Sequence, residues 1–339
     1  MIPKLRSRVP LSGSRLTDFV NGMQTCAIFP SVDVRRSMAK SREGSWCNVP
    51  ADTRGPQANH ISDKELDPRI LNIIARLPNC RTHVSDALFG YRYIRPYLDR
   101  IDGGSVLEVG SGPCILLSHI KMNYPALRLV GIEPIIGGFE TSREIATQLT
   151  RAHGLELFEG SYEEFVTEER FDLMFLINVF EHLPDWRHFL GFIERRLKPD
   201  GVCVILCPNY GFPYESHFRV PIILGKTVTR ALFKRKIVNH EVRTHAAGLW
   251  DSLNFVSLRQ IRRELMIHRK LRMIRHSRIL DEQIERLRSD PEFLERQRVL
   301  GVLAAALSRV GITRLFRVWP LEYLQPYLFL ELYITPYRA

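Results

Sequence analysis

The fold class that the sequence predicts is α/β, with a doubly wound parallel sheet and right-handed crossovers. Two observations lead to this prediction. Between residues 105 and 210, five short apolar stretches alternate with segments whose apolar residues recur at helical spacing. The fourth stretch, Phe171 to Ile177, is apolar almost throughout, as expected for a central strand that is buried on both faces.

The first predicted strand, Val106 to Val109, runs directly into Gly110 and Gly112. Glycines at such a point allow the backbone to turn sharply and a ligand to come close. Apolar residues between 115 and 120 then recur at helical spacing, which predicts a helix. Because open α/β sheets bind ligands at the carboxyl ends of their strands, this turn is the predicted centre of a ligand site.

The other elements are predicted from the same patterns. Ser62 and Glu65 form a capping box that begins a helix, and a second helix covers about 84 to 99. A turn at Lys198 to Gly201 precedes the fifth strand. We expect further strands at 127–132, 155–158, 202–207, 271–275 and 327–334, and further helices at 138–153, 185–197, 256–267, 279–289 and 292–310.

These elements divide the chain into parts. Residues 1–60 mix Pro, Ser, Gly and Arg without a regular period, which predicts a disordered arm. Residues 61–339 then form one domain, with N-terminal helices at 61–104, the ligand-binding core at 105–210, and an insertion, extra helices and closing strands at 211–339. The stretch 210–250 is too long for an ordinary loop, so it is a candidate lid or substrate-binding segment.

Composition excludes several classes of protein. Hydrophobic residues make up 45% of the chain, and no apolar run is long enough to span a bilayer, so an integral membrane protein is excluded. The six cysteines form no CxxC pair and no metal-binding pattern, which indicates a reduced, cytoplasmic setting. No apolar segment of a secretory signal follows the basic N-terminus, and an organelle presequence is the alternative for this basic, Ser-containing segment.

The net charge of +11 lies entirely after residue 210. A basic half of this kind indicates an anionic partner: a phosphate- or carboxylate-bearing substrate, a membrane surface, or RNA. A solvated basic surface is the alternative. Lys226, Arg230 and Lys234 to Lys236 lie among apolar residues, which predicts either a basic amphipathic helix on a membrane surface or a helix packed on the sheet.

Glu133 ends the second strand, 21 residues beyond Gly112. In a βαβ unit this is the position and spacing of an acid that hydrogen-bonds ribose hydroxyls. Ile115 occupies the position where a dinucleotide-binding fingerprint requires a small residue, which counts against a nicotinamide cofactor.

Residues 105–210 resemble class I S-adenosylmethionine-dependent methyltransferases. Four features in order carry the resemblance: the motif Glu108 to Gly112, the acidic strand end Glu133, the stretch Asn178 to Pro184, and Leu197 to Gly201. The resemblance implies a Rossmann-like, seven-stranded sheet of the methyltransferase type, with N-terminal helices and a helical insertion near the C-terminus. It also implies S-adenosylmethionine as cofactor.

The resemblance further implies a set of cofactor-binding residues: Glu108, Gly110, Ser111, Gly112, Glu133, Pro134, Ser161, Tyr162 and Asn178. Three of these differ from the family pattern or have a second interpretation. Ser161 stands where many relatives carry an acid, Tyr162 is more often a packing residue, and Glu108 could instead support the turn. Cys114 replaces a third glycine, and Pro113 before it suits the first turn of a helix.

His182 is the first candidate for a catalytic base, because it follows the fourth strand at the same sheet edge and titrates near neutrality. The alternative is a helix-entry histidine that bonds to backbone. Glu181 would orient this histidine or contact the cofactor, and a carboxylate that caps a helix is the alternative. His217 is a second candidate base, although an exposed loop histidine is the more common alternative. Glu215 and His217 lack an evident third ligand, so no metal is expected.

The function that follows is methyl transfer to a small-molecule, sugar or lipid-linked acceptor, at a hydroxyl oxygen. RNA methylation by the basic half is an alternative, although the chain contains no recognised RNA-binding module. A non-catalytic S-adenosylmethionine-binding protein is the third hypothesis. The sequence leaves the acceptor and the oligomeric state open.

Overall fold

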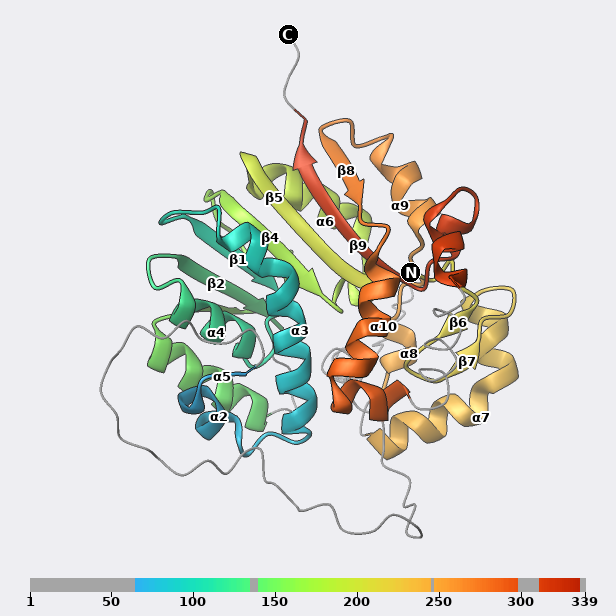
Figure 1. Cartoon of the computed structure of the whole chain (residues 1–339), viewed down its shortest axis with the longest axis horizontal. Helices are drawn as coiled ribbons and strands as arrows, with labels where there is room; N and C mark the ends of the chain where they lie inside the picture. Colours follow the sequence, from blue (N-terminus) through green and yellow to red (C-terminus); the bar gives the residue numbers. More distant parts are fainter. Residues whose placement is uncertain (1–64, 135–139, 245–246, 298–310, 336–339) are drawn as a thin grey trace, which may run out of the picture.

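A computed structural model describes residues 65–134, 140–244, 247–297 and 311–335 (Figure 1). The predicted arm at 1–60 lies outside these ranges. No helix within them combines the length and the hydropathy needed to cross a bilayer.

A seven-stranded sheet forms the centre of the molecule, with strand order β3-β2-β1-β4-β5-β9-β8. The first five strands pair in parallel, and β9 pairs antiparallel with both β5 and β8. This topology confirms the predicted seven-stranded, doubly wound sheet. The strands are β1 Ser105–Val109, β2 Arg128–Glu133, β3 Glu156–Glu159, β4 Phe171–Ile177, β5 Leu197–Pro208, β8 Leu271–Arg275 and β9 Tyr327–Ile334.

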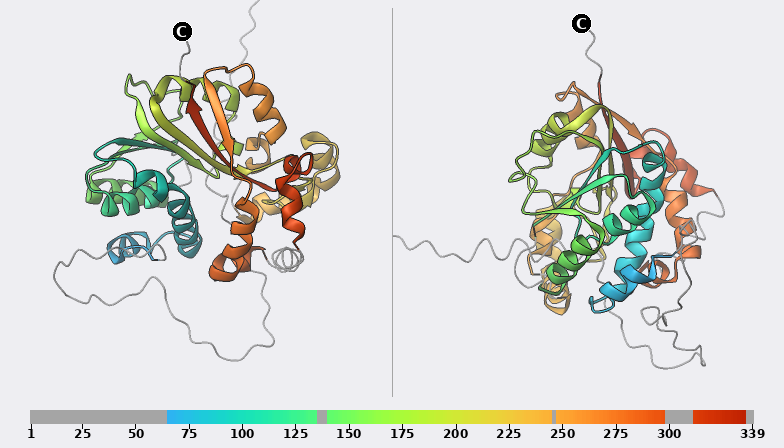
Figure 2. Two further views of the ribbon diagram at one scale, coloured as in Figure 1. Left: turned by 45° about the horizontal axis from the view of Figure 1, so that its top comes forward. Right: turned by 90° about the vertical axis from the view of Figure 1, so that its left-hand side faces the viewer.

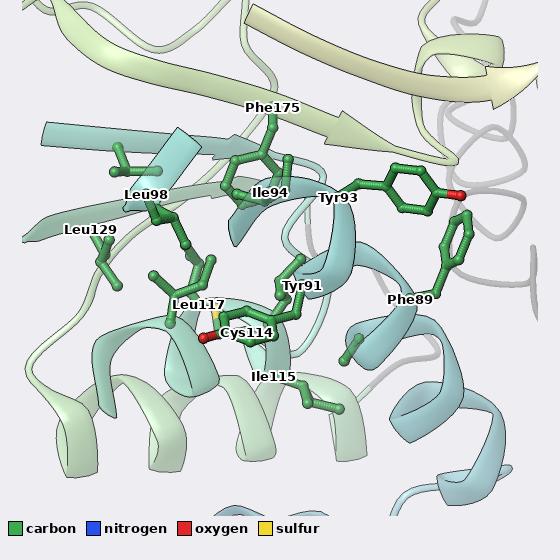
Figure 3. Close-up of a cluster of buried hydrophobic side chains, with 14 of the residues drawn as sticks. Phe89, Tyr91, Tyr93, Ile94, Leu98, Cys114, Ile115, Leu117, Leu129 and Phe175 are labelled. Atoms are coloured by element: carbon green, nitrogen blue, oxygen red, sulfur yellow. The ribbon is translucent and has the colours of Figure 1, made fainter. Parts of the chain in front are cut away.

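Helices cover both faces of this sheet and create two hydrophobic cores (Figure 2). Figure 3 shows one of these two cores, in which Tyr91, Cys114 and Leu117 gather beneath one face of the sheet. The helices on this face are α2 Pro68–Ile74, α3 Cys80–Leu98, α4 Ile115–Asn123, α5 Glu140–His153 and α10 Ile279–Ser289, and those on the other are α6 Trp186–Arg196 and α9 Leu258–Leu265.

Two local predictions near the chain's start are corrected. The helix that we expected from a Ser62 cap begins at Pro68, where the Asp67 carboxylate accepts a hydrogen bond from Arg69 N at 2.8 Å. Ser62 itself lies outside the described residues. Helix α3 begins at Cys80, one turn earlier than predicted, because the chain reverses at Asn79 in a left-handed conformation.

The predicted turn at Lys198 to Gly201 is part of a strand instead. Leu197 pairs with Phe171 and Val202 pairs with Leu173, so four residues of β5 oppose a single residue of β4. The extra residues form a bulge that shifts the register without ending the strand.

The insertion folds into a small unit of its own. It contains the short strands β6 Tyr214–Glu215 and β7 Val220–Pro221, the long helix α7 Lys226–Thr244 and the short helix α8 Leu249–Ser252. These elements share a third hydrophobic core formed by Phe218, Val220, Ile237, Leu249, Trp250 and Leu253. Figure 1 shows the unit beyond the carboxyl ends of β4 and β5.

Three further segments complete the described chain. Residues 291–297 continue as a helix after α10, and the rest of the helix predicted at 292–310 lies outside the described residues. The 3-10 helices η2 Ile312–Arg317 and η3 Leu321–Leu324 then lead into β9.

Candidate active site

The glycine turn after β1 is held tightly against its neighbours. The amides of Gly110 and Ser111 donate to the carbonyl of Ile132, at 2.8 and 3.2 Å. Gly110 has a φ of +77°, and a Cβ built there would lie 2.3 Å from Val179 Cγ2. Only glycine therefore fits at this position.

Two buried carboxylates meet beside this turn. Glu133 Oε2 accepts a hydrogen bond from the amide of Gly112 at 2.8 Å, so β2 and the turn are joined. Glu108 is 5% exposed, and burial raises its pKa well above the ordinary value, with the Glu133 carboxylate adding to the rise. Its Oε2 has no hydrogen-bond partner among the described residues. A donor such as a cofactor's amino group suits this oxygen.

Pro113 lies before helix α4 and not in its first turn, which corrects the prediction. The helix begins at Ile115, and Cys114 precedes it in a left-handed conformation with a φ of +61°. Cys114 is fully buried and packs in the core on the α3 side of the sheet. The core accommodates the side chain of Cys114, and the turn is kept.

The remaining candidate cofactor residues follow the other strand ends. Pro134 and Ser161 are half-buried after β2 and β3, and the Ser161 amide donates to Glu164. Asn178 follows β4 with a φ of +55°, and its Oδ1 accepts from the Tyr327 hydroxyl at 2.6 Å. Each of the three stands at the sheet edge that carries the glycine turn.

Tyr162 is a packing residue in this structure. Its ring makes an edge contact with Phe189, with centroids 4.9 Å apart, and a second with Phe192. Its hydroxyl donates to the carbonyl of Asp185 at 2.9 Å. These contacts support the packing interpretation and leave the adenine contact without support.

Glu181 and His182 lie in a buried 3-10 turn, η1 Phe180–His182, directly after β4. The turn is fixed by Asn254, whose amide donates to the carbonyl of Glu181 at 2.8 Å. The Asn254 side chain also donates to the carbonyls of Phe180 and Leu183. The segment that directly follows α8 thus holds the turn that carries these two side chains.

His182 is 1% exposed, and its ring is held by Ser252 of α8. Its Nδ1 lies 2.9 Å from Ser252 Oγ, and that hydroxyl donates to the carbonyl of Leu249 at 2.8 Å. Because the single hydroxyl proton is used there, we assign the ring hydrogen of His182 to Nδ1, where it can donate to Ser252 Oγ. Burial lowers the pKa of His182 well below its ordinary value, and His217 and Lys226 lower it further.

His217 is buried, so the exposed loop position that was the more common expectation is wrong. It is 8% exposed, and its ring centroid lies 5.7 Å from that of His182. Its Nδ1 lies 2.5 Å from Glu215 Oε1. Burial opposes the ionisation of Glu215, but His217 and the amides of His217 and Phe218 hold its pKa below the ordinary value.

The fold therefore brings together three residues that the sequence treated separately. One donor atom from each of Glu181, His182 and His217 lies within 4.8 Å of the other two.

A methyltransferase-domain family model matches residues 87–263. The chain is also 32% identical over 234 residues to an uncharacterised protein of Mycobacterium tuberculosis, covering 67% of this chain and 78% of that protein.

The chain belongs to the class I S-adenosylmethionine-dependent methyltransferases. The methyltransferase is also 21% identical, over 116 residues, to the ubiquinone biosynthesis O-methyltransferase of Rickettsia bellii, covering 34% of this chain and 47% of that enzyme. Among solved structures, coclaurine N-methyltransferase bound to N-methylheliamine and S-adenosylhomocysteine matches with a TM-score of 0.43 and 16% identity. That match covers 79% of this chain and 82% of the other.

Two residues that shape the site of this methyltransferase escaped the sequence analysis. Ser252 and Asn254 lie about 70 residues after the turn that they hold, at the end of α8 and just beyond it, where the sequence has no recognised motif. The residue type of Asn254 was a signal that could have revealed its role, because an asparagine side chain commonly forms hydrogen bonds with backbone groups in turns.

Proposed function

We propose that this methyltransferase transfers the methyl group of S-adenosylmethionine to a hydroxyl oxygen of a small-molecule, sugar or lipid-linked acceptor. The acceptor would bind between the carboxyl end of β4 and the insertion. The observation that carries the proposal is the buried cluster of Glu181, His182 and His217 at this edge. A hydroxyl acceptor must lose a proton, and the cluster offers the groups that this step requires.

On the cofactor side, we assign Glu133 to the ribose hydroxyls and Glu108 to the cofactor's amino group. The glycine turn, from Gly110 to Gly112, would pass close to the cofactor. The spacing of Glu133 and the buried Oε2 of Glu108 support these assignments. Pro134, Ser161 and Asn178 would complete the edge. The cofactor brings its own leaving group, so the protein's main contribution is alignment, worth roughly 7–11 kcal/mol.

On the acceptor side, His217 is the group best arranged to assist proton loss. Its partner Glu215 is a buried carboxylate that also accepts the amides of His217 and Phe218. A carboxylate so placed orients an imidazole and stabilises its positive charge. His182 has the neutral Ser252 as its partner, which supports a binding role beside His217.

Incubating the protein and labelled S-adenosylmethionine with cell extract tests this proposal. We expect label in the lipid, polysaccharide or small-molecule fraction. His217→Ala is expected to lower the rate of labelling about 10²–10⁴-fold while the affinity for S-adenosylmethionine is unchanged. His240→Ala removes another buried histidine of the insertion and serves as the control.

The outcomes separate the three hypotheses. Label in RNA would contradict the proposal and support the RNA methyltransferase. Cofactor binding without label in any fraction would support a non-catalytic protein. Equal rates for the wild type and the His217 variant would remove the role given to this histidine.

Helix α7 supports a further part of the proposal, contact with an anionic membrane surface. The helix packs inward through Thr229, Phe233, Ile237, His240 and Thr244. The outer face of α7 carries the exposed basic residues Lys234, Arg235 and Arg243, and none of the carboxylates of this helix is exposed. Between them lies an exposed apolar stripe of Val228, Leu232, Val238 and Val242. Such a face suits the interface of a membrane with anionic lipids.

Flotation with vesicles measures this contact. We expect binding to vesicles of phosphatidylglycerol and phosphatidylcholine and none to phosphatidylcholine alone. Reversing Lys234, Arg235 and Arg243 to glutamate should weaken binding at least 100-fold, since each basic residue near such a surface is worth about 1 kcal/mol. The control replaces Arg76, Arg81 and Arg151 with glutamate, because these arginines are exposed outside α7. Binding to RNA in place of vesicles, or equal loss in the control, would contradict the membrane contact.

The proposal also covers location and organisation. Cys114, Cys203 and Cys207 are buried and form no disulfide, which supports a cytoplasmic setting. We propose that residues 61–339 act as one domain, in which 105–210 hold the cofactor and the insertion closes the acceptor side.

A further inference from the structure

We propose that Glu181, His182 and His217 form a binding site for a divalent transition-metal ion. Glu181 and His182 come from the turn after β4, and His217 comes from the connection between β6 and β7. One donor atom from each lies within 4.8 Å of the other two, and all three residues are buried. The set differs from the Glu215 and His217 pair that the sequence analysis considered, because the fold supplies the missing ligands from another segment.

The outer contacts of the two histidines match those of metal ligands. His182 Nδ1 lies 2.9 Å from Ser252 Oγ, and because that hydroxyl donates to the Leu249 carbonyl, we assign the ring hydrogen to Nδ1. His217 Nδ1 donates to Glu215 Oε1. In each neutral ring the lone pair therefore lies on Nε2. A histidine that ligates a metal typically donates its other ring N–H to such a partner, which fixes the tautomer and the ring orientation.

The donor set determines the class of ion. Two imidazole nitrogens and one carboxylate oxygen suit zinc and neighbouring ions such as iron, cobalt and manganese, and they do not suit magnesium or calcium. His182 Nε2 lies 4.0 Å from Glu181 Oε1. Two donors on one tetrahedral zinc ion lie about 3.4 Å apart, so small side-chain rotations bring the three donors to coordination distance.

Three protein ligands leave a coordination position for an oxygen of the acceptor. An ion there would hold the hydroxyl in place and lower its pKa, so that the hydroxyl loses its proton to solvent water, and His217 would then serve as a ligand in place of a base. This catalytic consequence rests on the proposed function, because it needs a hydroxyl acceptor. The binding of the ion does not depend on it.

Titration of the metal-stripped full chain with Co²⁺, followed by visible absorption spectroscopy, tests the site. We expect d–d bands that saturate at one ion per chain and disappear when Zn²⁺ displaces the cobalt. His217→Ala should abolish the bands. Glu215→Gln should weaken binding about 10–100-fold by removing the outer partner. His240→Ala, a buried histidine outside the cluster, should bind as the wild type does.

Absence of saturable bands in the wild type would overturn the inference, as would unchanged binding in His217→Ala. Glu181→Gln, which keeps the side-chain volume, provides a second ligand variant should His217→Ala fail to fold, and unchanged binding in it would also overturn the inference. The labelling assay separates this inference from the proposed function. Label transfer without cobalt binding would refute the metal site alone, and cobalt binding without label transfer would refute the acceptor proposal alone.

Discussion

Replacing Gly110 with alanine is expected to cost about 2–5 kcal/mol of stability and to abolish cofactor binding. A left-handed conformation costs a residue with a Cβ roughly 1–2 kcal/mol, and forcing extra volume into a packed site costs about 1–3 kcal/mol. Both penalties apply, because Gly110 has a φ of +77° and its Cβ would lie 2.3 Å from Val179. To make room, Val179 must shift, and it connects β4 to the buried turn at Glu181.

Gly154→Ala is the matched control. Gly154 has a φ of +63°, but a Cβ there would meet no described atom within 4 Å. The substitution should therefore cost only about 1–2 kcal/mol. Urea unfolding of the two variants measures the difference. An equal loss of stability in both would mean that the close approach of Val179 does not matter.

Asp86→Ala is expected to destabilise the fold by about 3–5 kcal/mol, because it leaves two buried guanidinium groups without their shared carboxylate. Asp86 lies on α3, and its carboxylate accepts from Arg286 on α10 and from Arg296, at 3.0 and 2.8 Å. Both arginine side chains are less than 10% exposed. This network joins the C-terminal helices to the N-terminal ones.

The pH dependence of unfolding tests whether the Asp86 carboxylate must be ionised to stabilise the fold. Burial opposes the charge of Asp86, but Arg296 and Arg286 outweigh it and lower the pKa to about 2. The ion pairs should therefore stabilise the fold fully above the unfolded pKa of about 3.9, and this contribution should be lost as the pH falls toward 2. The gap between the wild type and Asp86→Ala should narrow over that range. A gap that is constant from pH 7 to pH 3 would contradict this account.

Asp251→Ala serves as the control for the ion pair. Asp251 pairs with Arg230 at 2.6 Å, but both side chains are more than half exposed. Pairs of this kind contribute at most about 1 kcal/mol, because water and salt screen them. A loss as large as that of Asp86→Ala would contradict the role given to burial.

The sheet was predictable because its signals are local. The bounds of β4 and β9 are those predicted, since each is a largely apolar run that contains a single acidic residue, Asp172 in β4 and Glu331 in β9. The glycine turn and Glu133 were also placed correctly at the sheet edge, because the order of strand, turn and helix brings them there in any sheet of this type.

The acceptor side could not be predicted because it depends on contacts between distant segments. His217 is buried beside His182 and Glu215, in an insertion that folds around a hydrophobic core of its own. The meeting of His217 with His182 needs the path of the whole insertion. Likewise, nothing in the sequence near Lys198 distinguishes a bulge within a strand from a turn that ends one, because the difference lies in the pairing with β4.

Calorimetric titration with S-adenosylmethionine tests the central claim most directly, namely that the glycine turn after β1 belongs to the cofactor site of a methyltransferase. We expect the wild type and Gly154→Ala to bind one molecule with similar affinity, and Gly110→Ala to bind none under conditions where it remains folded. NAD should not bind, since Ile115 prevents the close approach that its pyrophosphate needs. A folded wild type that fails to bind S-adenosylmethionine, or a Gly110 variant that binds it as tightly as the wild type, would contradict the claim.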